Sequence, residues 1–180
     1  MNNLSRYSAV EHLRDGRALE IRALHSGDRD GMLAAVDHTS ERSLHRRFFG
    51  AKRHFTDKEV EFFLNVDFTN HVALVAVADE DGARVIVGGG RYVITRPKQA
   101  EVAFAVVDRY QGQGIGAALM RHLVGIARAA GLRELTAEVL PDNTPMLKLF
   151  ERCGLGLDKR REAGVVHVTL QMPEAARGHA

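Results

Sequence analysis

The stretch that decides the fold reads Gln111-Gly112-Gln113-Gly114-Ile115-Gly116, and it joins a predicted strand over residues 99–107 to a predicted helix over residues 114–130. Main-chain N–H groups at the start of a helix lack partners, and the aligned peptide dipoles add partial positive charge there. Because glycine has no Cβ, a diphosphate can approach this backbone closely. The strand, the glycine turn and the helix are therefore predicted to bind a pyrophosphate group.

Two other interpretations of this turn stay open. The glycines could serve only a tight turn and a close contact between helix and sheet. The run Gly112-x-Gly114-x-x-Ala117 also matches the fingerprint of a dinucleotide-binding unit, as in a nicotinamide oxidoreductase. That unit opens a parallel sheet, whereas only 63 residues follow Ala117, and the nearest acidic residue, Glu134, stands at the start of a predicted strand. The dinucleotide interpretation is the weaker one.

The elements around the turn predict a mixed α/β sheet. Strands are expected at residues 18–23, 71–78, 84–95, 133–140 and 165–172, with a hairpin turn at Asp79-Glu80-Asp81-Gly82. Further helices are expected at residues 26–38, 41–49, 57–66 and 143–152. The order indicates one domain over residues 18–173, between a loosely held arm at 1–17 and a tail at 174–180.

The composition is that of an ordinary globular protein. The 180 residues fit one domain, and 25 Lys and Arg against 23 Asp and Glu leave a formal net charge of +2. This balance gives no reason to expect nucleic acid or a membrane as a partner. The N-terminus lacks a signal-peptide pattern, and the single Cys153 excludes an internal disulfide. We expect a cytoplasmic protein without a metal, either a monomer or a homodimer.

The turn resembles the acetyl-CoA signature of the GNAT superfamily of N-acetyltransferases, which is Arg or Gln, two residues, Gly, one residue, then Gly or Ala. Gln111, Gly114 and Gly116 stand at those positions. Further along, Asn143, Phe150 and Gly154-Leu155 resemble the family's later Asn, aromatic and Gly-aromatic positions. The resemblance implies the GNAT fold, a single domain with a mixed, mostly antiparallel central sheet flanked by helices. It also implies acetyl-CoA as the acetyl donor.

A narrower resemblance is to bacterial Pat-type protein lysine acetyltransferases. It rests on Ser43-Leu44-His45-Arg46-Arg47-Phe48-Phe49, and on Val66-Asp67-Phe68 shortly before Val72-Ala73-Leu74-Val75-Ala76. This resemblance implies a protein lysine as the acceptor of the acetyl group.

The family resemblance also implies a division of labour at the cofactor. Main-chain groups near Val106 and Val107 would pair with the pantetheine arm. Asn143 would reach the pantetheine or a water beside it, and Phe150 would form a wall of the acetyl pocket. The pyrophosphate would be held by the amides of Gln111, Gly112, Gln113, Gly114, Ile115, Gly116 and Ala117.

Acetyl transfer to an amine needs a proton acceptor, because a lysine amine has a pKa of about 10.4 and is mostly protonated at neutral pH. Glu101, in Ala100-Glu101-Val102-Ala103-Phe104, is the first candidate, and this segment resembles the base-bearing strand of histone-type GNAT acetyltransferases. We expect its apolar neighbours to bury it, which would strengthen it as a base. The competing interpretation is a solvated residue near the edge of the strand.

The sequence departs from the family at the general acid. Many GNAT enzymes have a Tyr where this chain has Phe150, which has no proton to give. Tyr110, Tyr92 or water could protonate the leaving thiolate. Alternatively no acid is needed, because a coenzyme A thiolate is a fairly good leaving group. Cys153 is expected to pack rather than to act as a nucleophile.

Two groups of polar residues, a basic cluster and the histidines, remain to be interpreted. A basic cluster near the predicted N-terminal helices is either a solvated face or a contact for an acidic protein or the cofactor's 3′-phosphate. It comprises Arg42, Arg46, Arg47, Lys52 and Arg53. The histidines show no metal-ligand spacing; His122 is expected at the surface of its helix, and His71 is a weaker candidate for the acceptor site.

Together these features predict an acetyltransferase that works by direct attack in a ternary complex, with a protein lysine as the acceptor. A small amine such as a polyamine or an aminoglycoside is the alternative within the same class. A non-catalytic acyl-CoA sensor is the alternative from another class, because the usual Tyr is missing.

Overall fold

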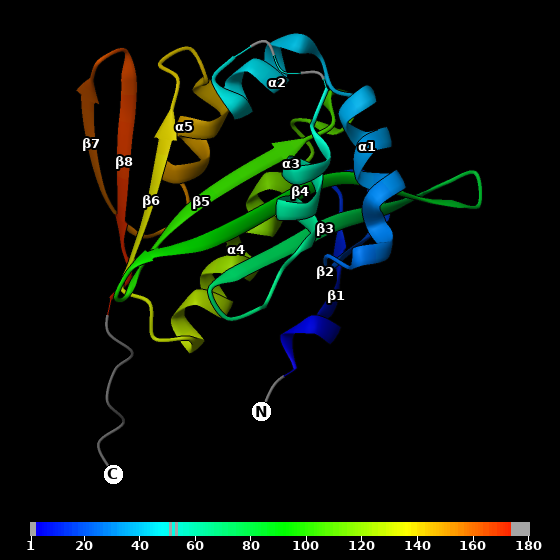
Figure 1. Ribbon diagram of the computed structural model, residues 1–180, viewed down its shortest axis with the longest axis horizontal. Helices are drawn as coiled ribbons and strands as arrows, with labels where there is room; N and C mark the ends of the chain where they lie inside the picture. The colour runs from blue at the N-terminus through cyan, green and yellow to red at the C-terminus, as the bar shows by residue number, and fades with distance from the viewer. Residues whose placement is uncertain (1–2, 51, 53, 174–180) are drawn as a thin grey trace.

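The computed structural model of the chain describes residues 3–50, 52 and 54–173 (Figure 1). Within these residues there is one eight-stranded sheet with the order β1-β2-β3-β4-β5-β6-β8-β7. The strands are β1 (Ser8–His12), β2 (Ala18–Ala23), β3 (His71–Glu80), β4 (Ala83–Arg96), β5 (Gln99–Val106), β6 (Glu134–Val139), β7 (Gly156–Glu162) and β8 (Val165–Gln171). All neighbours pair antiparallel except β5 and β6, which are parallel. The expected mixed, mostly antiparallel sheet is confirmed.

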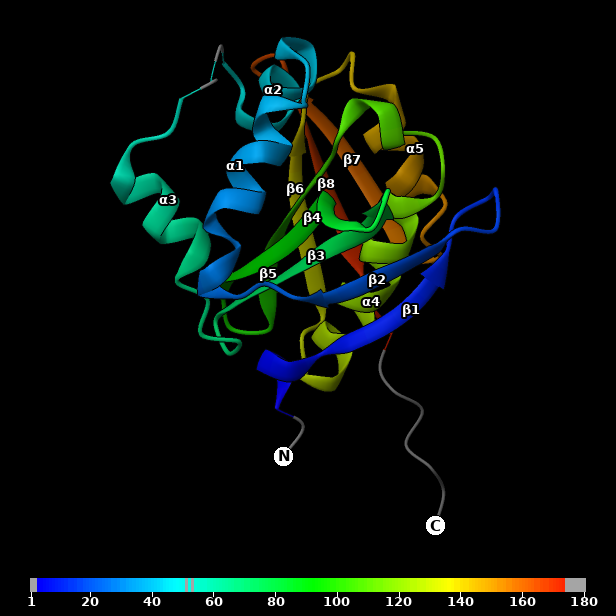
Figure 2. The same cartoon turned by 90° about the vertical axis from the view of Figure 1, so that its right-hand side faces the viewer.

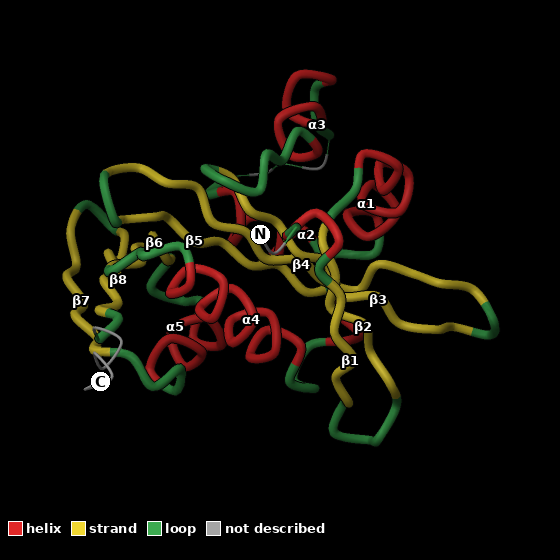
Figure 3. Tube along the Cα trace, turned by 90° about the horizontal axis from the view of Figure 1, so that it is seen from below, coloured by secondary structure: helices red, strands yellow, loops and turns green. Residues whose placement is uncertain are grey.

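Helices cover both faces of this sheet. They are α1 (Arg29–Asp37), α2 (Glu41–Phe48), α3 (Asp57–Leu64), α4 (Ile115–Ala129) and α5 (Thr144–Glu151). Helices α1 and α3 lie on one face, and α4 and α5 lie on the other (Figure 3). Helix α2 sits over the end of the sheet where β5 and β6 diverge (Figure 1). Over the described ranges, no helix has the length and apolar character needed to cross a membrane.

Most elements form where local sequence signals place them. Ser40 caps α2, because its hydroxyl accepts a hydrogen bond from the amide of Ser43 at 3.2 Å. Thr56 and Glu59 form a reciprocal capping box at the start of α3. The predicted strands and helices from residue 18 to residue 172 are confirmed, with ends displaced by a few residues at most.

The sequence does not predict the two edge strands. The arm at residues 1–17 was expected to be loosely held, and this is wrong for residues 8–12, because they form β1, which pairs with β2 along its whole length (Figure 2). At the other edge, β7 pairs with β8 and carries mostly exposed charged residues. Edge strands expose many side chains to solvent, so they lack the apolar alternation that identifies a strand. The expected tail at residues 174–180 lies outside the described residues.

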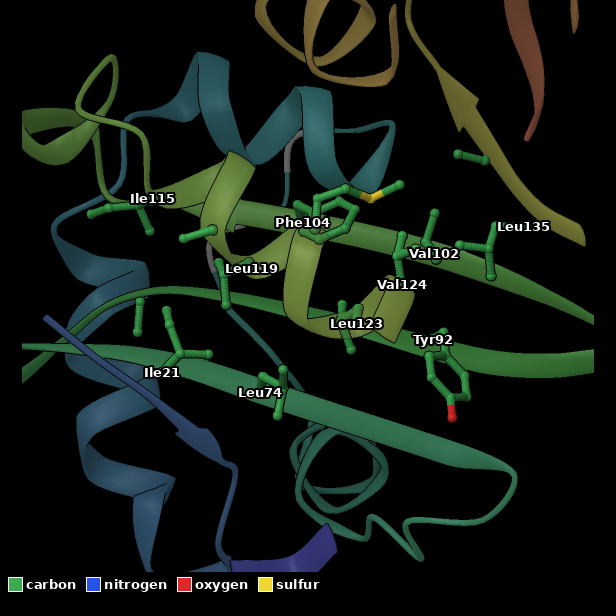
Figure 4. Close-up of a cluster of buried hydrophobic side chains, with 14 of the residues drawn as sticks. Ile21, Leu74, Tyr92, Val102, Phe104, Ile115, Leu119, Leu123, Val124 and Leu135 are labelled. Atoms are coloured by element: carbon green, nitrogen blue, oxygen red, sulfur yellow. The ribbon is translucent and has the colours of Figure 1, made fainter. Parts of the chain in front are cut away.

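The main core lies between α4 and the sheet (Figure 4). Ile115, Leu119 and Leu123 of the predicted apolar stripe are each at most 1% exposed. Gly90 in β4 makes room for the ring of Phe104 in β5, since a Cβ at residue 90 would lie 2.7 Å from Phe104 Cδ1. This close approach holds the middle of the sheet tightly against α4.

Strands β5 and β6 pair only at their first residues. Their register runs from Gln99↔Glu134 to Glu101↔Thr136, and beyond this point the two strands separate (Figure 1). Residues 102–106 of β5 therefore have no strand neighbour on this side among the described residues. An unpaired strand edge presents main-chain N–H and C=O groups that another molecule can use.

Side chains attach the N-terminal segment to α4. The Tyr7 hydroxyl contacts Nδ1 of His122, and Nε2 of His122 lies 2.7 Å from Glu11 Oε1. Arg121 donates to the other oxygen of Glu11 at 3.0 Å. His122 is therefore partly buried, and its expected position at the surface is wrong, because β1 covers this side of α4.

We expect Glu11→Gln to lower the free energy of unfolding by about 1–2 kcal/mol near neutral pH. Burial acts to raise the pKa of Glu11, but the hydrogen bonds from His122 and Arg121 outweigh it and hold this pKa below its usual value. The carboxylate thus stabilises the fold above its unfolded-state pKa of about 4.3, and this contribution is lost as pH falls through the lower folded-state pKa. Urea unfolding near pH 7, and again below about pH 4, measures both effects.

Glu162→Gln is the matched control for this prediction. Glu162 lies on the opposite edge strand, β7, is exposed, and forms no ion pair among the described residues. Its variant should keep the wild-type free energy of unfolding. If Glu11→Gln lost the same free energy at both pH values, the ionised carboxylate would not be the stabilising group.

Candidate active site

A cavity of about 900 Å³ lies where β5 and β6 diverge and continues beneath α2. Its walls come from both faces of the sheet, because α1 and α2 line one part while α4 and α5 line another. This volume suits a large small-molecule ligand. The cavity is lined by the following predicted site residues: Glu101, Val106, Val107, Gln111, Gly112, Gly114, Ile115, Gly116, Ala117, Asn143 and Phe150.

The glycine turn forms the end of the cavity next to α4. Gly112 and Gly114 have φ of 74° and 96°, in the left-handed region that glycine adopts without strain. Gly114 is the N-cap of α4, so the amides of the first helical turn have no helix carbonyl to bond. A Cβ at either glycine would meet nothing within 4 Å, so the space in front of the turn is open. This arrangement fits a bound diphosphate.

The two glutamines of the turn are engaged within the protein. Gln111 Nε2 donates to the Val106 carbonyl at 3.0 Å and to Ser43 Oγ at 3.2 Å, which ties the turn to β5 and α2. Gln113 Nε2 donates to the carbonyl of Arg109 at 3.0 Å. The cavity lining does not include Gln113, so a ligand contact at this predicted residue would have to come from its main chain.

The expectation for Val107 needs correction. Its amide donates to the Val87 carbonyl at 2.9 Å, and its carbonyl accepts from the Tyr110 amide at 2.8 Å. Neither main-chain group of Val107 is left for a ligand, although its side chain lines the cavity. Val106 directs its main-chain groups the opposite way, because successive residues of a strand alternate. The Val106 carbonyl already accepts from Gln111 Nε2, so the unpaired edge of β5 leaves the Val106 amide for a ligand.

Glu101 stands where β5 and β6 separate. It is the last residue of β5 that pairs with β6, and its neighbours Ala100 and Val102 are buried on the α4 side. Glu101 itself is exposed and lines the cavity, so its expected burial is wrong. Alternate residues of a strand point to opposite faces, so apolar neighbours along the chain do not enclose it.

The tyrosines considered as general acids are engaged elsewhere. Tyr92 is 1% exposed beside α4 (Figure 4), and burial raises its pKa to about 12. The cavity lining does not include it. Tyr110 does line the cavity, but its hydroxyl donates to Glu80 Oε1 at 2.5 Å. Of the three proton donors considered for the leaving thiolate, only water is not engaged elsewhere.

Helix α5 forms a further wall. Asn143 is its N-cap, and Asn143 Oδ1 accepts from the Met146 amide at 3.3 Å, so this side chain has a structural role whatever it binds. Phe150 is buried with its ring edge-on to Phe104. Cys153 also lines the cavity, and its thiol lies 3.0 Å from the Phe150 carbonyl.

The predicted basic cluster divides into different roles. Arg46 and Lys52 form ion pairs with acidic residues nearby. Arg42 is exposed, and Arg53 lies outside the described residues. Arg46 and Arg47 are both partly buried and line the cavity, but Arg47 forms no ion pair among the described residues. The cluster is therefore not one solvated face.

Sequence reasoning missed Arg91. It lies in β4 opposite Ala103 of β5 and lines the same cavity as Glu101. Its Nη1 group is 2.9 Å from Nε2 of His71, so the weaker candidate His71 contacts a cavity residue rather than the cavity itself. The sequence offers one hint of this residue, a single charged side chain inside an apolar, glycine-rich strand. Its contact with the cavity becomes visible only when the structure shows which face of the sheet it occupies.

Comparison with known proteins places the chain among acetyltransferases. Residues 38–155 match the model of the Acetyltransferase (GNAT) family. The chain is 34% identical over 154 residues to Acetyltransferase PA5475 of Pseudomonas aeruginosa, which covers 85% of this chain and 82% of that protein. It is 32% identical over 163 residues to Acetyltransferase Pat of Mycolicibacterium smegmatis, covering 89% of this chain and 48% of that protein.

A solved structure shows the same likeness. The crystal structure of the GNAT domain of S. lividans PAT has a TM-score of 0.83 and 32% sequence identity to this chain. The match covers 92% of this chain and 97% of that one. The sheet and its helices thus correspond over nearly the whole domain.

Proposed function

The chain belongs to the acetyltransferase (GNAT) family, and from this premise we propose that it transfers the acetyl group of acetyl-CoA to a lysine side chain of a protein, with Glu101 as the general base. The observation that carries the proposal is the cavity shared by the glycine turn of α4 and by Glu101 of β5. The turn would bind the donor, and Glu101 would act on the acceptor.

The donor side fits a coenzyme A thioester. The first turn of α4 offers N–H groups and a positive dipole end to the pyrophosphate. The unpaired edge of β5 offers the Val106 amide to an extended pantetheine arm, because Gln111 already binds the Val106 carbonyl. Asn143 and Phe150 line the same cavity. When bound, acetyl-CoA supplies the acetyl group as a thioester, so that a C–N bond forms as the C–S bond breaks.

The acceptor side must receive a neutral amine. A lysine amine is mostly protonated at neutral pH, so one proton has to leave before or during the attack. Glu101 is a carboxylate that lines the cavity at the point where β5 loses its neighbour. Its exposure allows it to take this proton, directly or through a water, and to release it to solvent.

A protein lysine is proposed because of the likeness to Pat proteins. The chain is 32% identical both to the M. smegmatis Pat and to the GNAT domain of S. lividans PAT. The Pat-like run at residues 43–49 forms most of α2, which covers the cavity. The chain spans 48% of the M. smegmatis protein, so this likeness concerns about half of that relative.

Calorimetric titration with acetyl-CoA, with NADH as the comparison ligand, tests the donor half of the proposal. We expect acetyl-CoA to bind with a Kd in the micromolar range and NADH to give no binding heat. Binding of NADH alone would mean that the glycine turn serves a dinucleotide. Acetyl-CoA would then not be the donor, and the proposed role of Glu101 as the general base would also be rejected.

Amine-dependent release of coenzyme A tests the acceptor half. Catalytic amounts of the enzyme are mixed with acetyl-CoA and a soluble protein extract, and acetylated lysines are identified by mass spectrometry. Release with polyamines or aminoglycosides alone would move the acceptor to small amines. Tight binding of acetyl-CoA without release for any amine would favour a sensor, which the engaged hydroxyl of Tyr110 would then explain.

A further inference from the structure

Two partly buried arginines line the cavity without an acidic partner among the described residues. Arg47 is in the last turn of α2, Arg91 is in β4, and both are partly buried. Within the described part of the chain neither forms an ion pair, whereas the partly buried Arg22 is paired with Asp28 at 2.8 Å. A guanidinium group taken out of water without a counter-ion costs free energy. A partner from outside the chain would remove this cost.

The charge of Arg47 also disfavours the charge of Arg91. Burial lowers the pKa of Arg47 to about 10, against the opposing effect of Glu101. Burial, and after it the charge of Arg47, lower the pKa of Arg91 to about 9. Both side chains stay protonated at neutral pH, so two positive charges lie near the one carboxylate that acts on either of them, Glu101. The excess positive charge favours an anion.

Contacts with Phe63 and His71 hold the side chain of Arg91 in place. Its Nη1 group donates to the Phe63 carbonyl at 3.2 Å, and its guanidinium lies 4.9 Å from the centre of the Phe63 ring. Burial and Arg91 lower the pKa of His71 to about 4, so His71 is neutral and its Nε2 can accept the other Nη1 hydrogen at 2.9 Å. The Nε and Nη2 groups of Arg91 have no acceptor among the described residues. Three of its N–H donors are thus available for a ligand.

The two arginines lie on the other face of the sheet from the pyrophosphate turn. Tyr92, the neighbour of Arg91 in β4, packs against α4 (Figure 4), so Arg91 points to the opposite face, where it contacts α3. In the sheet, Arg91 pairs with Ala103 and Glu101 pairs with Val93, two residues further along β4. Arg91 and Glu101 therefore share one face. On this face they would contact the acceptor rather than the phosphates of the donor.

We propose, resting on the function proposed above, that Arg47 and Arg91 bind an oxyanion, a carboxylate or a phosphate, that the acceptor carries close to its reactive amine. Guanidinium groups are planar forks whose paired N–H donors match the two oxygens of such a group. The preferred acceptor is then a lysine beside an acidic or phosphorylated residue. A free amine that carries its own carboxylate would meet the same requirement.

Matched acceptors that differ in one anionic group test this proposal. The probes are end-blocked peptides Ala-Lys-Asp-Ala and Ala-Lys-Asn-Ala, then Ala-Lys-phosphoSer-Ala and Ala-Lys-Ser-Ala. Nα-acetyl-lysine and its amide make the same comparison for a small molecule. We expect the anionic member of at least one pair to have a KM about tenfold or more below that of its neutral partner. The pair that shows this preference identifies the source of the oxyanion.

Variants then assign the preference to the two arginines. Arg47→Gln and Arg91→Gln should each reduce it to about twofold or less, while acetyl-CoA binding measured by calorimetry stays as in wild type. Arg42→Gln is the matched control, because Arg42 is on the same helix as Arg47 but is exposed and does not line the cavity. It should keep the full preference.

The outcomes separate this proposal from the proposed function. Equal KM values within every pair, or a preference that survives in both arginine variants, would overturn the oxyanion site. If wild type acetylates none of the probes, the same peptides are titrated by calorimetry into protein saturated with coenzyme A. Tighter binding of an anionic peptide that is lost in Arg91→Gln would keep the site while the proposed reaction fails. Equal binding within each pair would overturn the site as well.

Discussion

Glu101→Gln is expected to reduce turnover by a factor of about 10² to 10⁴ and to leave the Kd for acetyl-CoA within about twofold of wild type. Glutamine keeps the size of the side chain but cannot take a proton from the amine. Glu101 lies on β5 away from the glycine turn, so its loss does not disturb the donor. Initial rates of coenzyme A release, together with calorimetric titration of acetyl-CoA, separate the two effects.

The pH dependence makes this test sharper. Without a base, only amine that has already lost its proton to solvent can react, so the residual rate should rise as pH approaches the amine pKa of about 10.4. The deficit is therefore largest at low pH. A variant whose pH–rate curve has the wild-type shape would exclude Glu101 as the base.

Glu138→Gln is the matched control for Glu101→Gln. Glu138 is an exposed glutamate on the neighbouring strand β6, lines the same cavity, and lies 3.5 Å from His167. It should keep turnover close to wild type, because His167 and not the acceptor is its neighbour. Loss of turnover in Glu138→Gln with normal turnover in Glu101→Gln would transfer the role of base to β6.

Gly114→Ala is expected to raise the Kd for acetyl-CoA by about tenfold or more. At a φ of 96° a residue with a Cβ is strained, by roughly 1–2 kcal/mol, and the turn can relax only by turning its peptide groups. The amides that would hold the pyrophosphate then no longer converge, and a Cβ enters the open space in front of the turn. Calorimetry with acetyl-CoA gives the Kd directly.

Gly131→Ala controls for the strain itself. Gly131 follows the other end of α4, has a φ of 80°, and has nothing within 4 Å of an added Cβ, but it does not line the cavity. Both variants should lose a similar free energy of unfolding. Only Gly114→Ala should lose affinity for acetyl-CoA, and equal weakening in both would mean that the turn has no special part in binding.

Together the variants are expected to divide the site into three functions. Gly114→Ala should change donor affinity, Glu101→Gln should change turnover, and Arg91→Gln should change the KM of an anionic acceptor. The division follows from the sheet, because the glycine turn begins α4 on one face while Arg91 and Glu101 point to the other. The separation of β5 from β6 joins the two sides in one cavity.

The sequence by itself determined the elements whose signals are local. Ser40 and Thr56 start helices because their hydroxyl groups accept a backbone N–H within the next turn. The turn at Asp79-Glu80-Asp81-Gly82 and the glycine turn before α4 depend on backbone conformations that a few adjacent residues decide. For the same reason the conformation of the glycine turn, which we propose binds the pyrophosphate, could be predicted from six consecutive residues.

Only the tertiary structure decided what depends on which strands lie side by side. Strands β1 and β7 form because β2 and β8 supply hydrogen-bonding partners, which no apolar pattern in their own sequences announces. The exposure of Glu101, the partial burial of His122 and the pairing of Arg91 with His71 are set by strand faces and by contacts between residues far apart in the chain. The burial of a side chain and the charges around it depend on the folded structure, so the proposed acceptor side of the site could be found only from the fold.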